Sequence, residues 1–250
     1  MPITVQLFTA TGVRAQHPQA QVTVPAGYKI VGGGALSNWS GAGNLLTASY
    51  PATATRWMAA AKDHEVISPA SLTVFAYAIH DPANEWDVVI QTAKAAPAPH
   101  PQVAATLPAG YVLTGGGAQV HYTGAGNFLT ASYPVGSSGW EARGKDHAIP
   151  DPAAITAYAI GLRHRTGAIR VTGTVVAVTE PGLSSHPLAW ASLDLGWIPS
   201  GGGALTSSHG PGNLLTGSFP VGLSWAAAAK DHVHASGATM TSFVLGIREG

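Results

Sequence analysis

Residues 44–51 read NLLTASYP, and this stretch occurs three times in the chain. It recurs as NFLTASYP at residues 127–134 and as NLLTGSFP at residues 213–220. A Gly-Gly-Gly-Ala motif, beginning at Gly32, Gly115 or Gly201, stands twelve positions before the Asn of each copy. Repetition at a fixed period indicates a protein built from structural repeats.

Other markers keep the same spacing in all three copies. A Trp follows each copy, and Lys-Asp-His begins five residues beyond that Trp. A His-Pro pair lies upstream, ten residues before a Gly. The repeats run over residues 3–82, 86–165 and 168–250 with no long linker between them. We therefore expect one domain, residues 1–250, made of three repeats related by pseudo-threefold symmetry.

Each repeat is predicted to consist of β-strands. Short segments rich in Val, Thr and aromatic residues are bounded by Gly or Pro, as at residues 3–8, 45–50 and 72–79. After Trp57 the side chains alternate, so that the Trp and small residues share one face while Lys62 and His64 share the other. This alternation predicts an all-β fold with the Trp side chains in the core and the Lys and His side chains directed outward.

Composition excludes several classes of protein. The chain has 250 residues, 46% of them apolar and 10% charged, which disfavours disorder and coiled coils. Twelve basic and twelve acidic residues cancel, so we expect no nucleic acid or anionic membrane as partner. No apolar run is long enough to span a membrane, and no cysteine is present. We expect a soluble chain without a signal peptide and favour a secreted location; the oligomeric state stays open.

The motifs Pro-Ala-Gly-Tyr, Gly-Gly-Gly-Ala, Leu-Thr-Ala-Ser-Tyr-Pro and Thr-Ala-Tyr-Ala-Ile together resemble repeat modules of many bacterial proteins. They are more distantly similar to the threefold repeats of vitelline-membrane-outer-layer proteins, and this resemblance implies a β-prism-like fold. Such modules usually carry one Cys before Pro-Ala-Gly and another after Tyr-Ala-Ile. Here those positions hold Val24 and His80 in the first repeat and Leu107 and Gly161 in the second, so that disulfide is absent. β-Prism relatives of the jacalin type are lectins, which favours a carbohydrate ligand by analogy.

Several polar residues persist among the three repeats although their neighbours differ. Residues 58–61, 141–144 and 226–229 differ between repeats, yet Lys-Asp-His follows each of them. A carboxylate and an amide beside an aromatic ring are typical of sites that bind vicinal hydroxyls. We therefore predict lectin-like, non-catalytic binding of a polyhydroxylated small molecule or glycan at up to three equivalent sites, without cofactor or metal. The candidate ligand-binding residues are His17, Asn44, Lys62, Asp63 and His64 in the first repeat, His100, Asn127, Lys145, Asp146 and His147 in the second, and His186, Asn213, Lys230, Asp231 and His232 in the third.

Two alternatives stay open. The Asp side chains could instead close a turn, with Lys and His as solvated neighbours. An enzyme, either a hydrolase or a metal-dependent one, is the less favoured class, and no catalytic residue is assigned. Asp63 and His64 point to opposite faces of a strand, so an Asp–His pair would need His17, whose place the sequence leaves undefined. A zinc site would need His64 and its two counterparts to converge on the pseudo-axis, against the alternation.

Overall fold

The computed structural model describes residues 2–207 and 210–250, and this part of the chain is all β, with eighteen strands and no helix. The strands form three six-stranded antiparallel sheets, which confirms the all-β, threefold architecture. Accordingly, the described residues contain no helix long and apolar enough to cross a lipid bilayer.

The first sheet contains, in spatial order, β1 (Val5–Thr11), β6 (Ser71–His80), β3 (Tyr28–Asn38), β16 (Leu214–Val221), β17 (Ser224–Lys230) and β14 (Leu188–Ser192). The second contains β13 (Val171–Ser184), β18 (Ala238–Glu249), β15 (Ile198–Thr206), β10 (Asn127–Val135), β11 (Gly139–Asp146) and β8 (Gln102–Thr106). The third contains β2 (Gln19–Thr23), β5 (Arg56–Lys62), β4 (Leu45–Thr53), β9 (Val112–His121), β12 (Ala153–His164) and β7 (Trp86–Ala98).

Every sheet joins three strands of one repeat to three strands of another. The first sheet combines repeats one and three, the second repeats three and two, and the third repeats one and two. The two halves meet through short ladders, such as the pairing of Gly217 and Ser218 with Leu36 and Ala35. No repeat therefore has a sheet of its own.

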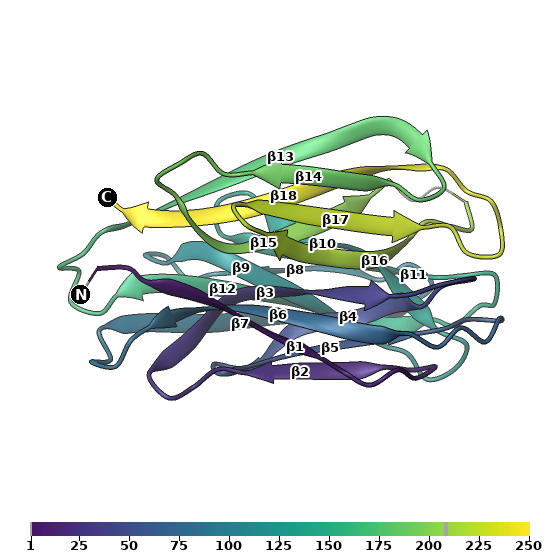
Figure 1. Ribbon diagram of the computed structural model, residues 1–250, viewed down its shortest axis with the longest axis horizontal. Coiled ribbons are helices and arrows are strands. Elements are labelled where there is room, and N and C mark those ends of the chain that lie inside the picture. The colour runs from purple at the N-terminus through teal and green to yellow at the C-terminus, as the bar shows by residue number, and fades with distance from the viewer. Residues whose placement is uncertain (1, 208–209) are drawn as a thin grey trace.

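The strands run along the long axis of the molecule (Figure 1). Both chain termini lie at the left-hand end of this view, and the loops that follow β5, β11 and β17 lie at the right-hand end. We call the first end the terminal end and the second the Lys-Asp-His end, after the motif that its loops carry.

The three repeat tryptophans occupy the core, as the alternation predicts. Trp57, Trp140 and Trp225 are completely buried. Each indole N–H donates to a serine hydroxyl of the strand-paired NLLTASYP copy: Trp57 to Ser49 (3.0 Å), Trp140 to Ser132 (2.9 Å) and Trp225 to Ser218 (2.8 Å). The one polar atom of each ring is thereby satisfied within the core.

The Gly-Gly-Gly segments of β3, β9 and β15 meet where the three sheets come together. A Cβ on Gly32 would lie 2.1 Å from the carbonyl oxygen of Ser200. A Cβ on Gly115 would lie 2.8 Å from the Cα of Gly32, and one on Gly201 would lie 2.6 Å from the carbonyl oxygen of Thr114. Backbone touches backbone in a closed ring, and no side chain fits between the three strands.

The variant Gly32→Ala tests this close approach. Its methyl group must displace the β15 backbone, which no rotamer change can avoid, so we expect a loss of about 1–3 kcal/mol or more in the free energy of unfolding. Urea denaturation of both proteins measures the difference. Gly182→Ala on β13 is the matched control, because nothing lies within 4 Å of a Cβ there. Equal losses in the two variants would contradict the packing described.

Candidate functional site

Each repeat places an exposed imidazole beside a carboxylate at the Lys-Asp-His end. The pairs, measured from Nε2 to Oδ1, are His17 with Asp63 (3.5 Å), His100 with Asp146 (3.6 Å) and His186 with Asp231 (3.7 Å). The imidazole side chains are 58%, 70% and 57% exposed, whereas the carboxylates are largely buried. The sequence left the position of His17 undefined, and the structure brings it to the Asp.

The predicted Asn residues hold the turns that carry these histidines. Each Asn is completely buried and donates from Nδ2 to the carbonyl of the residue before the His. These bonds join Asn44 to Gln16 (2.7 Å), Asn127 to Pro99 (2.8 Å) and Asn213 to Ser185 (3.2 Å). The backbone N–H of the paired Asp donates to the same carbonyl. Each His-Pro turn is thereby fixed from two directions beside its carboxylate.

The second oxygen of each carboxylate binds its own loop. Asp63 Oδ2 accepts the backbone N–H of Ser68 (2.9 Å), and longer contacts join Asp231 Oδ2 to the N–H of Ser236 (3.3 Å) and Asp146 Oδ2 to that of Asp151 (3.4 Å). This is the turn-closing role that the sequence left open as an alternative. It engages Oδ2 and leaves Oδ1 on the side of the imidazole.

The expectation that the three lysines face outward is wrong: Lys62, Lys145 and Lys230 are buried. Each Nζ donates a hydrogen bond to the backbone of the Gly-containing turn of the next repeat. Lys230, for example, donates to the carbonyl oxygen of Ala42 (2.6 Å). That turn covers the outer face of the strand end. The lysines on this face are therefore buried, although the alternation along their own strand predicts that they are exposed. Burial lowers the pKa of all three amines, against the opposing effect of nearby Asp carboxylates.

The three histidines of Lys-Asp-His also face inward, contrary to the alternation, because they follow the ends of β5, β11 and β17. Their rings gather with centroids 5.3–5.7 Å apart. Nε2 of each faces the backbone carbonyl of the next in a ring: His64 to His147 (2.8 Å), His147 to His232 (2.7 Å) and His232 to His64 (2.5 Å). Nδ1 of each faces a carbonyl of the neighbouring turn. The nitrogens point at carbonyls, and the described residues contain no His, Asp and Glu cluster placed to hold a metal ion.

Burial lowers the pKa of His64 and His147, although the surrounding carbonyls act in the opposite direction. The neighbouring imidazoles lower these two pKa values further, because like charges at this separation repel one another.

Aromatic residues of a neighbouring repeat lie beside the His–Asp pairs. The Trp39 ring centroid is 5.7 Å from that of His186, and Lys230 Nζ lies 5.1 Å from the Trp39 ring. Tyr122 lies over Lys62 in the same way, at 4.8 Å. The corresponding position in the third repeat falls at residues 208–209, outside the described residues. The sequence pattern does not assign Trp39 to the neighbouring repeat's site; the aromatic residue at the equivalent position of the second repeat, Tyr122, was the available signal.

No known protein-family model matches this chain, and a search of curated proteins finds no similar sequence.

The histidine ring predicts a fall in stability on acidification. In the unfolded chain His64 and His147 bind protons near pH 6.5, whereas burial lowers their pKa in the folded state, so the folded state is penalised as the pH falls from 6.5 towards 5. The slope is at most about 1.4 kcal/mol per pH unit for each excluded proton. Urea denaturation between pH 5 and pH 8 measures it.

The variant His147→Gln removes one titrating group while keeping a donor, so its slope below pH 6.5 should be shallower than that of the wild type. Identical slopes for His147→Gln and the wild type would contradict the proton exclusion.

Proposed function

We propose that this protein binds a polyhydroxylated small ligand, such as a carbohydrate, without catalysis and at up to three equivalent sites at the Lys-Asp-His end. The observation that carries the proposal is that an exposed imidazole lies 3.5–3.7 Å from a largely buried carboxylate in all three repeats. A purely structural role requires no exposure of the imidazole in any of the three repeats.

The chemistry of each pair suits vicinal hydroxyl groups. The Oδ1 atom of Asp accepts a hydrogen bond from one hydroxyl, while the adjacent imidazole nitrogen exchanges a hydrogen bond with the next. A carboxylate acceptor makes the stronger of these bonds because it is charged. Trp39 adds an aromatic face beside His186, against which the apolar face of a sugar ring packs.

In this proposal the remaining predicted residues support the pairs. The Asn residues hold the His-Pro turns, while the lysines and the central histidines fasten each repeat to the next. A cavity of about 190 Å³ beside His100, bounded by Arg143, Lys145 and Gly210, is large enough for part of a monosaccharide. Three such sites on one rigid body give avidity to ligands that bind each site weakly.

We further propose that the three sheets form a β-prism, related to the bacterial repeat modules and the vitelline-membrane-outer-layer proteins. The exchange of strands between repeats, with three sheets surrounding a tryptophan-filled core, supports this arrangement. A lectin-like activity agrees with that relationship by analogy of fold.

A hydrolase is the second candidate, because each repeat places an imidazole 3.5–3.7 Å from a carboxylate, the two groups that serve as general base and orienting residue in such enzymes. Among the described residues, however, none of these three imidazoles is hydrogen-bonded to a serine or threonine hydroxyl. Binding therefore accounts for the geometry with fewer additional groups than catalysis does.

Calorimetric titration with neutral monosaccharides and short oligosaccharides at millimolar concentration tests the proposal. His186→Ala should lower the stoichiometry from three towards two, since one pair loses its imidazole. Trp39→Ala should weaken the same site about two- to tenfold, the worth of one aromatic contact.

His80→Ala is the control, because His80 ends β6 at the terminal end of the molecule and should leave all sites intact. Absence of binding to any sugar in the panel would contradict the proposal, as would equal stoichiometry in wild type and His186→Ala. Turnover of an ester or glycoside that His186→Ala diminishes would favour the hydrolase.

A further inference from the structure

The terminal end of the molecule contains three junctions where one repeat passes to the next. Strand register identifies their equivalent residues: Lys29 pairs with Ile79, Val112 with Leu162 and Ile198 with Ile247. Two positions beyond these partners stand Asp81, His164 and Glu249 respectively. The side chain at this position therefore differs between the repeats: two of them carry a carboxylate and one carries an imidazole.

Two of the three junctions are closed by a carboxylate of the chain. Asp81 accepts the backbone N–H groups of Glu85 (2.7 Å) and Trp86 (3.2 Å) and the amine of Lys29 (2.5 Å). Glu249 accepts the N–H of Ile3, the residue equivalent to Trp86, at 2.8 Å. In both cases an oxyanion joins the end of one repeat to the start of another.

The third junction has no such carboxylate. His164 takes that position, and its ring packs edge-on against Trp86 (5.1 Å) with Nδ1 3.1 Å from the hydroxyl of Thr166. A cavity of about 710 Å³ lies here, lined by residues 110–112, 162–167 and 169–171. No Asp or Glu lines it, whereas three arginines do.

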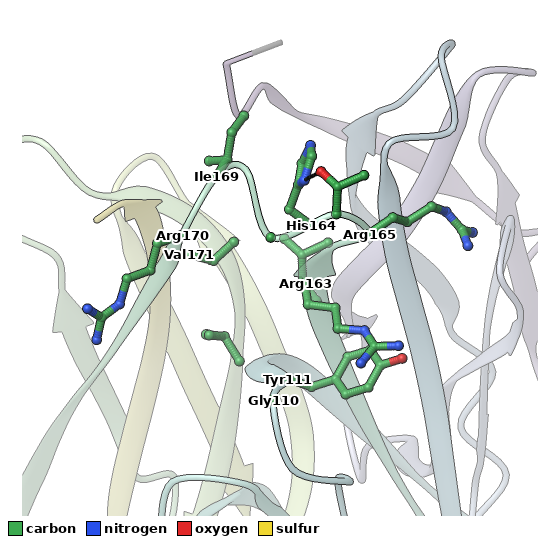
Figure 2. A pocket seen from close by; sticks show the side chains of 12 residues that line it. Gly110, Tyr111, Arg163, His164, Arg165, Ile169, Arg170 and Val171 are labelled. Atoms are coloured by element: carbon green, nitrogen blue, oxygen red, sulfur yellow. Dashed lines mark hydrogen bonds between the residues drawn. The ribbon is translucent and has the colours of Figure 1, made fainter.

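Two of these arginines have no basic counterpart at the other junctions. Arg163 is a structural residue, because it covers the Tyr111 ring (4.3 Å) as its equivalent Arg248 covers Trp197 (4.2 Å). Arg165 and Arg170 instead occupy the positions of Pro82 and Glu85. Figure 2 shows these two side chains extending in opposite directions from the loop at the cavity.

The arginines outnumber their carboxylate partners. Asp87 alone pairs with both Arg163 (2.9 Å) and Arg165 (3.8 Å). Arg170 is exposed and has no carboxylate partner among the described residues. Asp87 is thus shared by Arg163 and Arg165, while Arg170 lies on the other side of the loop.

We propose that this cavity binds a small molecule carrying an oxyanion, either a carboxylate or a phosphate group. The oxyanion takes the place that Asp81 and Glu249 fill at the other two junctions, and Arg170, whose side chain has no carboxylate partner among the described residues, binds it by charge-assisted hydrogen bonds. An adjoining cavity of about 680 Å³ shares Tyr111 and Val112 with the first and carries the hydroxyls of Ser137 and Ser138. It accommodates the uncharged part of the ligand.

Calorimetric titration of the full chain with inorganic phosphate, glucuronate and glucose tests the proposal. Phosphate or glucuronate should bind at least tenfold more tightly than glucose, and the better of the two anions identifies the preferred oxyanion. Arg170→Gln should weaken the anion about tenfold or more without changing the melting temperature, because this side chain has no partner to lose.

His164→Glu is the more direct variant, since it supplies the missing carboxylate as Glu249 does. It should abolish anion binding, whereas the uncharged His164→Gln should retain it. Equal binding of glucose and the anions, no binding of either anion, or full affinity in His164→Glu would overturn the proposal. If His164→Glu does not fold, unchanged affinity in Arg170→Gln overturns it.

Discussion

Backbone contact between three glycine segments is the constraint on which the rest of this structure depends. Gly32, Gly115 and Gly201 meet in a ring with no room for a Cβ, so β3, β9 and β15 approach one another far more closely than ordinary packed strands. The next glycine of each segment lies beneath a tryptophan ring: a Cβ on Gly33 would be 2.6 Å from Trp57. The centre of the molecule thereby sets the spacing of all three sheets.

The Lys-Asp-His motif forms a second ring of contacts between the three repeats, at one end of the molecule. Burying an amine costs free energy, and carbonyls of the next repeat compensate for it by accepting hydrogen bonds from the amine. Each repeat therefore depends on its neighbour for satisfaction of its own buried polar groups. The exposed His–Asp pairs sit on this cyclic scaffold, which explains why their three distances differ by only 0.2 Å between the shortest and the longest.

The sequence alone predicts the three repeats, the strands and the tryptophan core, because all three follow from the spacing of the repeated motifs and the alternation of side chains along each strand. It failed for Lys62 and His64, since the turn that buries them belongs to another repeat and alternation describes only one strand. It also placed the Tyr-Ala-Ile motifs of repeats one and two in equivalence. The ladders instead align Tyr158 with Phe75, because both pair with the third glycine of their repeat's Gly-Gly-Gly segment. A shift of two residues keeps every side chain on its face, so the hydrophobic pattern gives no sign of it.

That two-residue shift conceals the asymmetry of the terminal end. Only in the structural register do Asp81, His164 and Glu249 fall together, with two carboxylates and one histidine in a position that closes a junction. Loss of one closure leaves the other two in place and the central glycine contact untouched, so the fold tolerates it. This freed junction is where we propose that a single ligand binds. Arg165 and Arg170 stand there at the positions of Pro82 and Glu85, so the junction that lacks a closing carboxylate is also the one where basic residues replace uncharged and acidic ones.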